Sequence, residues 1–319
     1  MCPIVAAAIT HQGMAAYITP MKLLTLARLV RLPNVFTAFA DIGLGLCATV
    51  ALSPASVDES FAWKAALLLA ASGLLYMAGM VWNDYFDFEE DKRERSFRPL
   101  PSGRISLRTA IGIGLGLLIV GWTCAAITGR TGAMIGLALV AAILAYDARI
   151  KRTPFGPIGM ALCRFFNVLL GLSLADTVAL PSITRVHLAL AVGVYIVGVT
   201  WFARTEEKRS DAKVLVRAAI VMLVAALLAL AVATRVPPGT SSVYFPYLLV
   251  LAGFWVGGPV LAAIRKPTPE RVQAGVKRSI FGLVVLDALM ASVFVGSWGL
   301  LLVLLLPPAL LLGKWVYST

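Results

Sequence analysis

Hydrophobic runs of about 20 residues recur along the whole 319-residue chain, and they limit its fold more than any other feature. One of them, AWKAALLLAASGLLYMAGM, ends directly before a strongly charged segment. A run of this length crosses a hydrocarbon core of roughly 30 Å as a helix. Only helices and closed barrels satisfy their backbone hydrogen bonds in lipid, and these runs lack the period-two alternation of barrel strands. The sequence therefore predicts an all-α fold, a polytopic membrane helical bundle of about nine to ten transmembrane helices.

The composition agrees with this fold class, because 60% of the residues are hydrophobic, only 14% are charged and the mean hydropathy is +0.88. No soluble domain is expected. Residues 1–20 are interpreted as a disordered extension, and residues 21–319 as a single transmembrane domain. The predicted spans lie near 34–53, 62–86, 106–128, 131–148, 157–178, 186–204, 212–234, 244–264, 277–296 and 298–316.

The basic residues predict the orientation of these spans. With ten spans, 23 of the 28 Lys and Arg residues fall on one side of the membrane. The positive-inside tendency makes that side cytoplasmic. We therefore expect a multi-pass protein of the cytoplasmic (inner) membrane, with its charged segment facing the cytoplasm. The net charge of +12 is attributed to basic residues that orient the spans and contact anionic membrane lipids. No nucleic-acid partner is expected.

Cysteine and histidine usage excludes several kinds of site. The four cysteines show no CxxC pairing, and three of them lie in apolar spans, which is typical of packing residues. Only two histidines are present. A His-rich metal site and a Ser-His-Asp hydrolase are therefore not expected.

The segment NDYFDFEED follows the second predicted span and concentrates carboxylates at its end. Asp84, Asp87 and Asp91 have the spacing i, i+3, i+7, which places them on one face of a continuous helix, with Asn83 beside Asp87. Three carboxylates on one face repel each other unless a cation joins them. Hard oxygen ligands suit Mg²⁺, which is commonly shared with substrate phosphates. The alternative is a solvated acidic loop that balances the Arg/Lys run behind it.

The pattern N-D-x-x-D-x-x-x-D at this position is similar to the first aspartate-rich motif of the UbiA superfamily of intramembrane prenyltransferases. The similarity continues in RPLPSGRIS, in RLPNVF before the first span, and in YDARIKRTPFGPIGMALCRFFNVLLG between spans four and five. Together these segments cover roughly Arg31 to Asp211. Within the superfamily, the chain resembles most the UbiA-like branch found in Ebo gene clusters.

This resemblance implies a helical bundle around a lipid-facing cavity, with Mg²⁺ as cofactor. It implies transfer of an isoprenyl group from an isoprenyl diphosphate to a hydrophobic or aromatic acceptor, with release of pyrophosphate. Asp84, Asp87, Asp91 and Lys151 are the expected catalytic residues, and the three aspartates are also the expected metal ligands. The expected substrate-binding residues are Asn34, Asn83, Arg98, Tyr146, Arg152, Arg164 and Asn167.

The family usually carries a second aspartate-rich motif after the sixth span, where this chain reads WFARTEEKRSDAKVLVR. Glu207 and Asp211 stand four residues apart, so their side chains share a helix face. They are interpreted as a second metal or diphosphate site. A charged, solvated loop is the alternative.

Ionisable residues inside predicted spans are costly in lipid and tend to be functional. Arg164 and Asn167 share a face of the fifth span and are interpreted as cavity-lining residues. Asp41 and Asp287 also lie within spans, and Asp287 is expected to act as a structural pairing residue. The sequence leaves open which aspartate pairs with Arg164.

Two other functions share some of these features. The first is a non-catalytic carrier or transporter of isoprenoids or lipids with the same fold, which the degenerate second motif favours. The second is a CDP-alcohol phosphotransferase, whose motif begins D-G-x-x-A-R, and NDYFDFEED has neither that Gly nor that Arg. The complete first motif favours the prenyltransferase over both.

Overall fold

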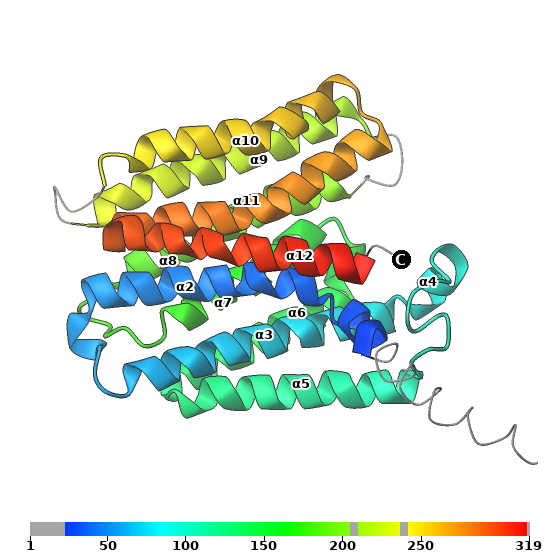
Figure 1. Cartoon of the computed structure of the whole chain (residues 1–319), viewed down its shortest axis with the longest axis horizontal. Coiled ribbons are helices and arrows are strands. Elements are labelled where there is room, and N and C mark those ends of the chain that lie inside the picture. Colours follow the sequence, from blue (N-terminus) through cyan, green and yellow to red (C-terminus); the bar gives the residue numbers. More distant parts are fainter. Residues whose placement is uncertain (1–22, 205–209, 237–241, 318–319) are drawn as a thin grey trace, which may run out of the picture.

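The computed structural model describes residues 23–204, 210–236 and 242–317. Long helices run side by side with nearly parallel axes and form an elongated bundle (Figure 1). The α-helices are α2 (Val35–Leu52), α3 (Phe61–Phe86), α4 (Phe88–Glu94), α5 (Leu107–Ile127), α6 (Arg130–Ala148), α7 (Gly156–Gly171), α8 (Ser182–Ala203), α9 (Ala212–Leu230), α10 (Phe245–Arg265), α11 (Pro269–Val295) and α12 (Leu306–Tyr317). The 3₁₀ helices are η1 (Leu32–Asn34), η2 (Pro54–Ser56), η3 (Ile150–Arg152), η4 (Ala231–Arg235) and η5 (Gly296–Leu305).

Eight of the described helical segments are long and apolar enough to cross a membrane, which makes the chain a multi-pass membrane protein. The last of these segments, Pro269–Val316, is 48 residues long and turns back on itself at Gly296. The φ of 60° at Gly296 lies in the left-handed region, which glycine adopts at little cost. With this double pass and the shorter apolar helix α7, the described chain crosses the bundle ten times.

The observed helices confirm the predicted all-helical membrane fold and most of the predicted spans. The exceptions are spans five and nine. Helix α7 ends at Gly171, not near residue 178, because the chain turns there and the Arg185 guanidinium donates to four carbonyl groups of the following loop. Helix α11 begins at Pro269, eight residues before the predicted start, because its first turns are polar and hydropathy does not detect them.

Helices α2 and α7 approach each other unusually closely. A Cβ on Gly45 would lie 2.4 Å from the carbonyl carbon of Gly171, and a Cβ on Gly171 would lie 2.8 Å from the carbonyl oxygen of Ile42. The missing side chains let the two backbones touch. As a result, Asp41 on α2 reaches Arg164 on α7.

Large apolar side chains cover much of the outer surface of the bundle. Ile119 on α5, Leu223 on α9 and Phe254 on α10 are 62%, 61% and 74% exposed. Exposed apolar surface of this extent is normal for a protein whose solvent is lipid. The outward faces of these helices therefore fit the membrane interior.

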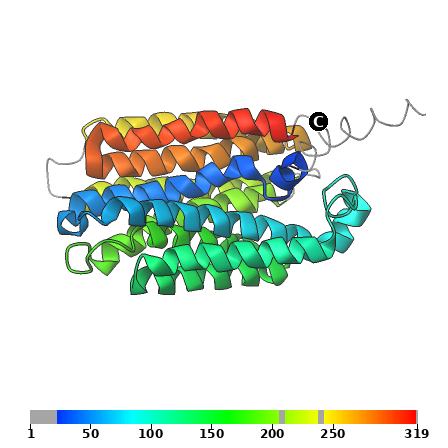
Figure 2. The same ribbon diagram turned by 60° about the horizontal axis from the view of Figure 1, so that its bottom comes forward.

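Helix α4 projects from one end of the bundle in both views (Figures 1 and 2). The C-terminal end of α12 lies at the same end. Helix η3, which follows α6, also contacts the end of α3 there, because Lys151 and Arg152 bond to backbone carbonyls of Asn83 and Phe86. The charged segments that are far apart in the sequence thus meet at one end of the bundle.

Candidate functional site

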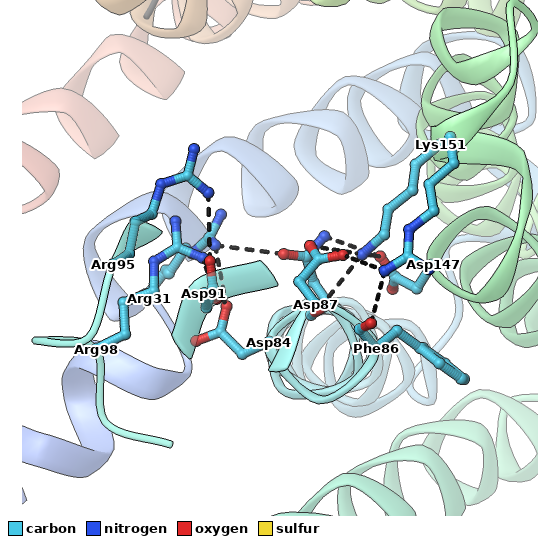
Figure 3. Close-up of polar contacts among 11 residues, drawn as sticks. Arg31, Asp84, Phe86, Asp87, Asp91, Arg95, Arg98, Asp147 and Lys151 are labelled. Carbon is cyan, nitrogen blue, oxygen red and sulfur yellow. Dashed lines mark hydrogen bonds and ion pairs between the residues drawn. The ribbon is translucent and has the colours of Figure 1, made fainter. Parts of the chain in front are cut away.

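The acidic segment does not continue α3 as a single straight helix. Helix α3 ends at Phe86 and α4 begins at Phe88, and Asp87 between them has φ −93° and ψ 5°. The predicted common face of Asp84, Asp87 and Asp91 is therefore wrong. The break directs Asp87 to one side of the helix end, whereas Asp84 and Asp91 face the other side (Figure 3).

The first polar group is the lysine cluster, formed by Asn83, Asp87, Asp147, Lys151 and Arg152. Figure 3 labels its Asp87, Asp147 and Lys151. The Lys151 Nζ lies 2.8 Å from Asp87 Oδ2, and an Arg152 guanidinium nitrogen lies 3.1 Å from Asp87 Oδ1. The Asn83 amide donates to Asp147 Oδ1 at 3.1 Å, and Lys151 lies 3.9 Å from that same oxygen. Two cations and two carboxylates leave this cluster with no net charge.

The second group is the arginine cluster, formed by Arg31, Asp84, Asp91, Arg95 and Arg98. Arg98 lies 2.7 Å from Asp91 and 3.6 Å from Asp84. Arg31 lies 3.1 Å from Asp84, and Arg95 lies 3.3 Å from Asp91. Asp84 and Asp91 are almost completely buried, so these ion pairs provide the compensation that buried carboxylates require.

Arg31 has an unusual backbone conformation. Its φ of 47° is positive, and no other non-glycine residue among those described shares this feature. Left-handed backbone is costly for a residue with a Cβ, and such strain concentrates at functional sites. Arg31 directly precedes η1, and it lines the main cavity described below and a second cavity of about 370 Å³. The strained conformation thus places a guanidinium between them.

The main cavity has a volume of about 410 Å³ and extends from this end of the bundle into its interior. Most of its wall is apolar, including Leu139, Ile143 and Leu283. Four predicted substrate-binding residues line it, namely Asn34, Tyr146, Arg164 and Asn167. Asp147 belongs to both this wall and the lysine cluster, so the charged groups lie at the mouth of an apolar cavity.

Arg164 and Asn167 form a polar network with α2 inside the bundle. Arg164 donates to Asp41 Oδ2 at 3.0 Å and to the Thr37 hydroxyl at 2.6 Å. Asn167 donates to the same Asp41 oxygen at 2.8 Å. Asp41 is therefore the partner of Arg164 that the sequence left open. Asp287 is fully buried, and neither of its carboxylate oxygens has a hydrogen-bond donor among the described residues.

The donor set of the two clusters fits Mg²⁺ only in part. Among residues 23–204, 210–236 and 242–317, no three His, Cys, Asp or Glu side chains lie close enough to hold a metal ion by themselves. Mg²⁺ usually takes one or two carboxylates and completes its octahedron with water and substrate phosphate. The carboxylates at the cavity mouth suit that shared mode of binding.

The predicted second acidic site is only partly described. Glu207 lies outside the described residues. Asp211 is exposed, and its carboxylate accepts a hydrogen bond from the Lys213 amide at 2.9 Å. In this arrangement Asp211 caps the N-terminus of α9.

Sequence reasoning missed two residues of the site. Asp147 was not predicted, although its position four residues before Lys151 and next to Tyr146 at a span end is a usable signal. The sequence indicates a place for Arg31 in the basic segment before the first span and at the start of RLPNVF, but no role in the site. Its role depends on a backbone conformation that no local pattern reveals.

Comparison with known proteins identifies related sequences. The profile of the UbiA prenyltransferase family matches residues 44–279. Digeranylgeranylglyceryl phosphate synthase from Methanococcoides burtonii is 38% identical over 133 residues, which is 41% of this chain and 47% of that protein. The enzyme of the same name from Methanoregula boonei is 39% identical over 35% of this chain and 39% of its own length. The matched region thus spans less than half the length of these relatives.

Solved structures share the fold. A structure from work on digeranylgeranylglyceryl phosphate synthase in membranes has a TM-score of 0.62 at 21% identity, covering 86% of this chain and 99% of that one. The apo structure of a UbiA homologue from Aeropyrum pernix K1 has a TM-score of 0.61 at 17% identity, covering 82% and 97%. A UbiA homologue from Archaeoglobus fulgidus bound to GPP and Mg²⁺ has a TM-score of 0.57 at 14% identity, covering 83% and 99%.

Proposed function

The chain belongs to the UbiA prenyltransferase family, and we propose that it is a membrane-embedded, Mg²⁺-dependent prenyltransferase. In the proposed reaction, the allylic C–O bond of an isoprenyl diphosphate breaks and pyrophosphate leaves. The isoprenyl carbon then bonds to a hydrophobic or aromatic acceptor, which gives up a proton. The observation that carries this proposal is the lysine cluster at the mouth of the main apolar cavity.

The lysine cluster supplies the groups that a diphosphate requires. Lys151 and Arg152 are the proposed diphosphate-binding cations, because they converge on Asp87 from η3. Asp87 is the proposed principal metal ligand, with Asp84 and Asp91 as further ligands once they are released from their arginines. When bound, Mg²⁺ neutralises charge on the leaving group. A second metal at Glu207 and Asp211 stays a prediction.

The main cavity provides the proposed site for the isoprenyl tail. Its apolar wall excludes water, and the polar residues that line it are few. Asn34 and Tyr146 lie toward the diphosphate end, where they are proposed to contact substrate. Arg164 and Asn167 are proposed to contact substrate from the deeper wall, held by Asp41. Asn83 orients Asp147 at the mouth.

The proposed location is the cytoplasmic (inner) membrane, with the two clusters facing the cytoplasm. The concentration of Lys and Arg at this end of the bundle supports that side. Membrane lipids then contact the outer apolar surface of the bundle. No nucleic-acid partner is proposed. The placement in the branch found in Ebo gene clusters stays a prediction, as does the assignment of residues 21–319 to one domain.

The test uses the full chain in nanodiscs with Mg²⁺ and radiolabelled geranylgeranyl diphosphate. Pyrophosphate release is followed over a panel of acceptors. Because the relatives are named as synthases of digeranylgeranylglyceryl phosphate, the panel includes a glyceryl phosphate lipid. Asp87→Asn should abolish release. Glu90→Gln is the matched control, because Glu90 is an exposed acid on α4, and it should leave release unchanged.

The same experiment separates the enzyme from the carrier alternative. One observation favours a carrier. All three motif aspartates are in ion pairs, and the described residues contain no preformed metal site. Tight binding that needs Asp87, with no pyrophosphate release for any acceptor, would identify a carrier. The absence of Mg²⁺-dependent binding would refute both functions.

A further inference from the structure

The proposed reaction releases a proton that has no assigned destination. When the isoprenyl carbon bonds to the acceptor, the acceptor loses a proton from its hydroxyl group or its aromatic ring. A positioned side chain that takes such a proton typically accelerates the reaction by about 100-fold to 10,000-fold. The reacting atom of the acceptor lies beside the allylic carbon, which is next to the diphosphate. A base is therefore expected where the main cavity meets the lysine cluster.

Asp147 is the one carboxylate in the wall of the main cavity. Among the described residues that line this cavity, no other Asp, Glu or His is present. Tyr76, Tyr146 and Cys163 also line it, but phenol and thiol groups ordinarily keep their proton near neutral pH. The arginines in the wall stay protonated. Asp147 is therefore the wall residue whose chemistry suits the acceptance of a proton.

The two carboxylate oxygens of Asp147 have different surroundings. The Asn83 amide donates to Oδ1 at 3.1 Å, which fixes the orientation of the carboxylate. Oδ2 accepts no hydrogen bond from the described residues and stays accessible. It lies beside Gly79, one helical turn before Asn83 on α3, where an added Cβ would be 4.0 Å away. Gly79 also lines the main cavity, so the space next to Oδ2 is open to a substrate atom.

Lys151 links this carboxylate to the proposed diphosphate site. Its Nζ lies 2.8 Å from Asp87 Oδ2 and 3.9 Å from Asp147 Oδ1 (Figure 3). The longer distance exceeds that of a hydrogen bond, and Arg152 pairs with Asp87. Neither of the proposed diphosphate-binding cations therefore holds Asp147 by a hydrogen bond. The carboxylate lies close to the leaving group and is free to accept a proton.

We propose that Asp147 is the catalytic base and that its Oδ2 takes the proton of the acceptor. The allylic C–O bond breaks, and its electron pair leaves with pyrophosphate. A lone pair of an acceptor hydroxyl, or the π electrons of an aromatic ring, forms the new bond to the isoprenyl carbon. The O–H or C–H bond then breaks, its electron pair stays on the acceptor, and the proton moves to Asp147. Water or the departing pyrophosphate removes this proton before the next turnover. This inference rests on the proposed function.

The test uses the full chain in nanodiscs with Mg²⁺, radiolabelled geranylgeranyl diphosphate and an acceptor that the wild type turns over. Asp147→Asn keeps the shape of the side chain and an oxygen for the Asn83 amide, and it should lower turnover at saturating substrate by at least about 100-fold. Its affinity for geranylgeranyl diphosphate, measured by calorimetry, should equal or exceed that of the wild type, because Lys151 loses a nearby carboxylate. Retained binding also shows that the variant is folded. Glu90→Gln, which changes an exposed acid on α4, should alter neither quantity.

Chemical rescue separates a base from a residue that only positions Lys151. Asp147→Ala leaves a space that formate can enter from the main cavity. Formate should raise the turnover of this variant by at least about tenfold, whereas an equal concentration of chloride should not. Equal effects of formate and chloride would overturn the proposal. A loss of diphosphate affinity in Asp147→Asn that accounts for its whole loss of turnover would also overturn it.

The wild-type result distinguishes this inference from the proposed function. Pyrophosphate release by the wild type, together with turnover of Asp147→Asn above about a tenth of the wild-type rate, would refute the base alone. Pyrophosphate itself would then be the proton acceptor, and the proposed function would stand. The absence of release by the wild type with every acceptor would refute the proposed function, and the base with it.

Discussion

Asp41→Asn should destabilise the protein strongly, because it removes the only carboxylate paired with Arg164 among the described residues. The Asp41 side chain is fully buried and the Arg164 side chain is 13% exposed. The substitution keeps the shape of residue 41, removes its charge and replaces one acceptor oxygen by an amide donor. It therefore isolates the electrostatic part of the contact between α2 and α7.

The magnitude follows from the burial of the pair and from the partners that remain. Removing one member of a buried ion pair typically costs about 3–5 kcal/mol, since the other charge is left uncompensated. Arg164 keeps its hydrogen bond to Thr37 at 2.6 Å, and an Asn at position 41 still offers a carbonyl oxygen. These partners place the expected loss at the lower end, about 3 kcal/mol.

The assay is equilibrium unfolding with SDS in mixed micelles, followed by tryptophan fluorescence. Glu59→Gln is the matched control, because Glu59 is an exposed acid, and its unfolding midpoint should match the wild type. Replacing both partners, as Asp41→Leu with Arg164→Met, should recover much of the loss, because neither member of the pair is then left as an unpaired buried charge. A midpoint for Asp41→Asn equal to that of the control would refute the assignment of a buried, charged pair.

Four further outcomes test other parts of the structure. Gly171→Ala should lower the unfolding free energy by about 1–3 kcal/mol in the same SDS assay, because its Cβ meets backbone that cannot move aside; no change would contradict the close approach of α2 and α7. Hydrogen bonds from the backbone amides of the following turn lower the pKa of Asp176 in the folded protein. The ionised carboxylate therefore adds to the free energy of unfolding, fully above about pH 4, the pKa of an unfolded Asp. This contribution is lost as pH falls through the lower pKa of the folded state. Asp176→Asn should therefore flatten part of the acid-induced fall of the thermal midpoint, and an unaltered pH profile would count against this turn. Asp287→Asn should raise the thermal midpoint or leave it unchanged, because an amide can donate to the unpaired Asp41 Oδ1 nearby; a loss above about 1 kcal/mol would contradict this. Lys151→Met should weaken Mg²⁺-dependent diphosphate binding about tenfold in calorimetry, whereas partition of a tail-only isoprenoid alcohol should stay the same; equal effects on both ligands would argue against a diphosphate role.

The sequence predicted the bundle well because hydropathy alone sets which segments lie in lipid. Prediction was poorer where the packing of one helix against another sets the end of a helix or the partner of a buried charge. The end of α7 depends on Gly171 against the α2 backbone and on the carbonyl groups that Arg185 holds, and both partners are remote in sequence. Only the three-dimensional structure identifies Asp41 as the partner of Arg164.

In the candidate site too, the features set by neighbouring residues in the sequence were predicted, and those set by contacts between distant segments were not. The acidic motif and Lys151 were predicted, and the structure brings Asp87 and Lys151 together. The separation of Asp87 from Asp84 was not predicted, because it results from the helix break and from cations on two other segments. Whether these residues bind metal and substrate stays a prediction that the proposed assays test.

Because α4 follows the helix break at Asp87, an insertion or deletion in the acidic segment should disturb its ion pairs more than a substitution at an exposed position. Each residue added to a helix turns everything beyond it by about 100°. One inserted residue between Asp84 and Asp91 would therefore rotate α4 and carry Asp91 away from Arg98, even with every charged residue retained. Related chains with the same ion pairs should tolerate substitutions at exposed positions such as Glu89 and Glu90, yet keep the seven-residue interval free of insertions and deletions.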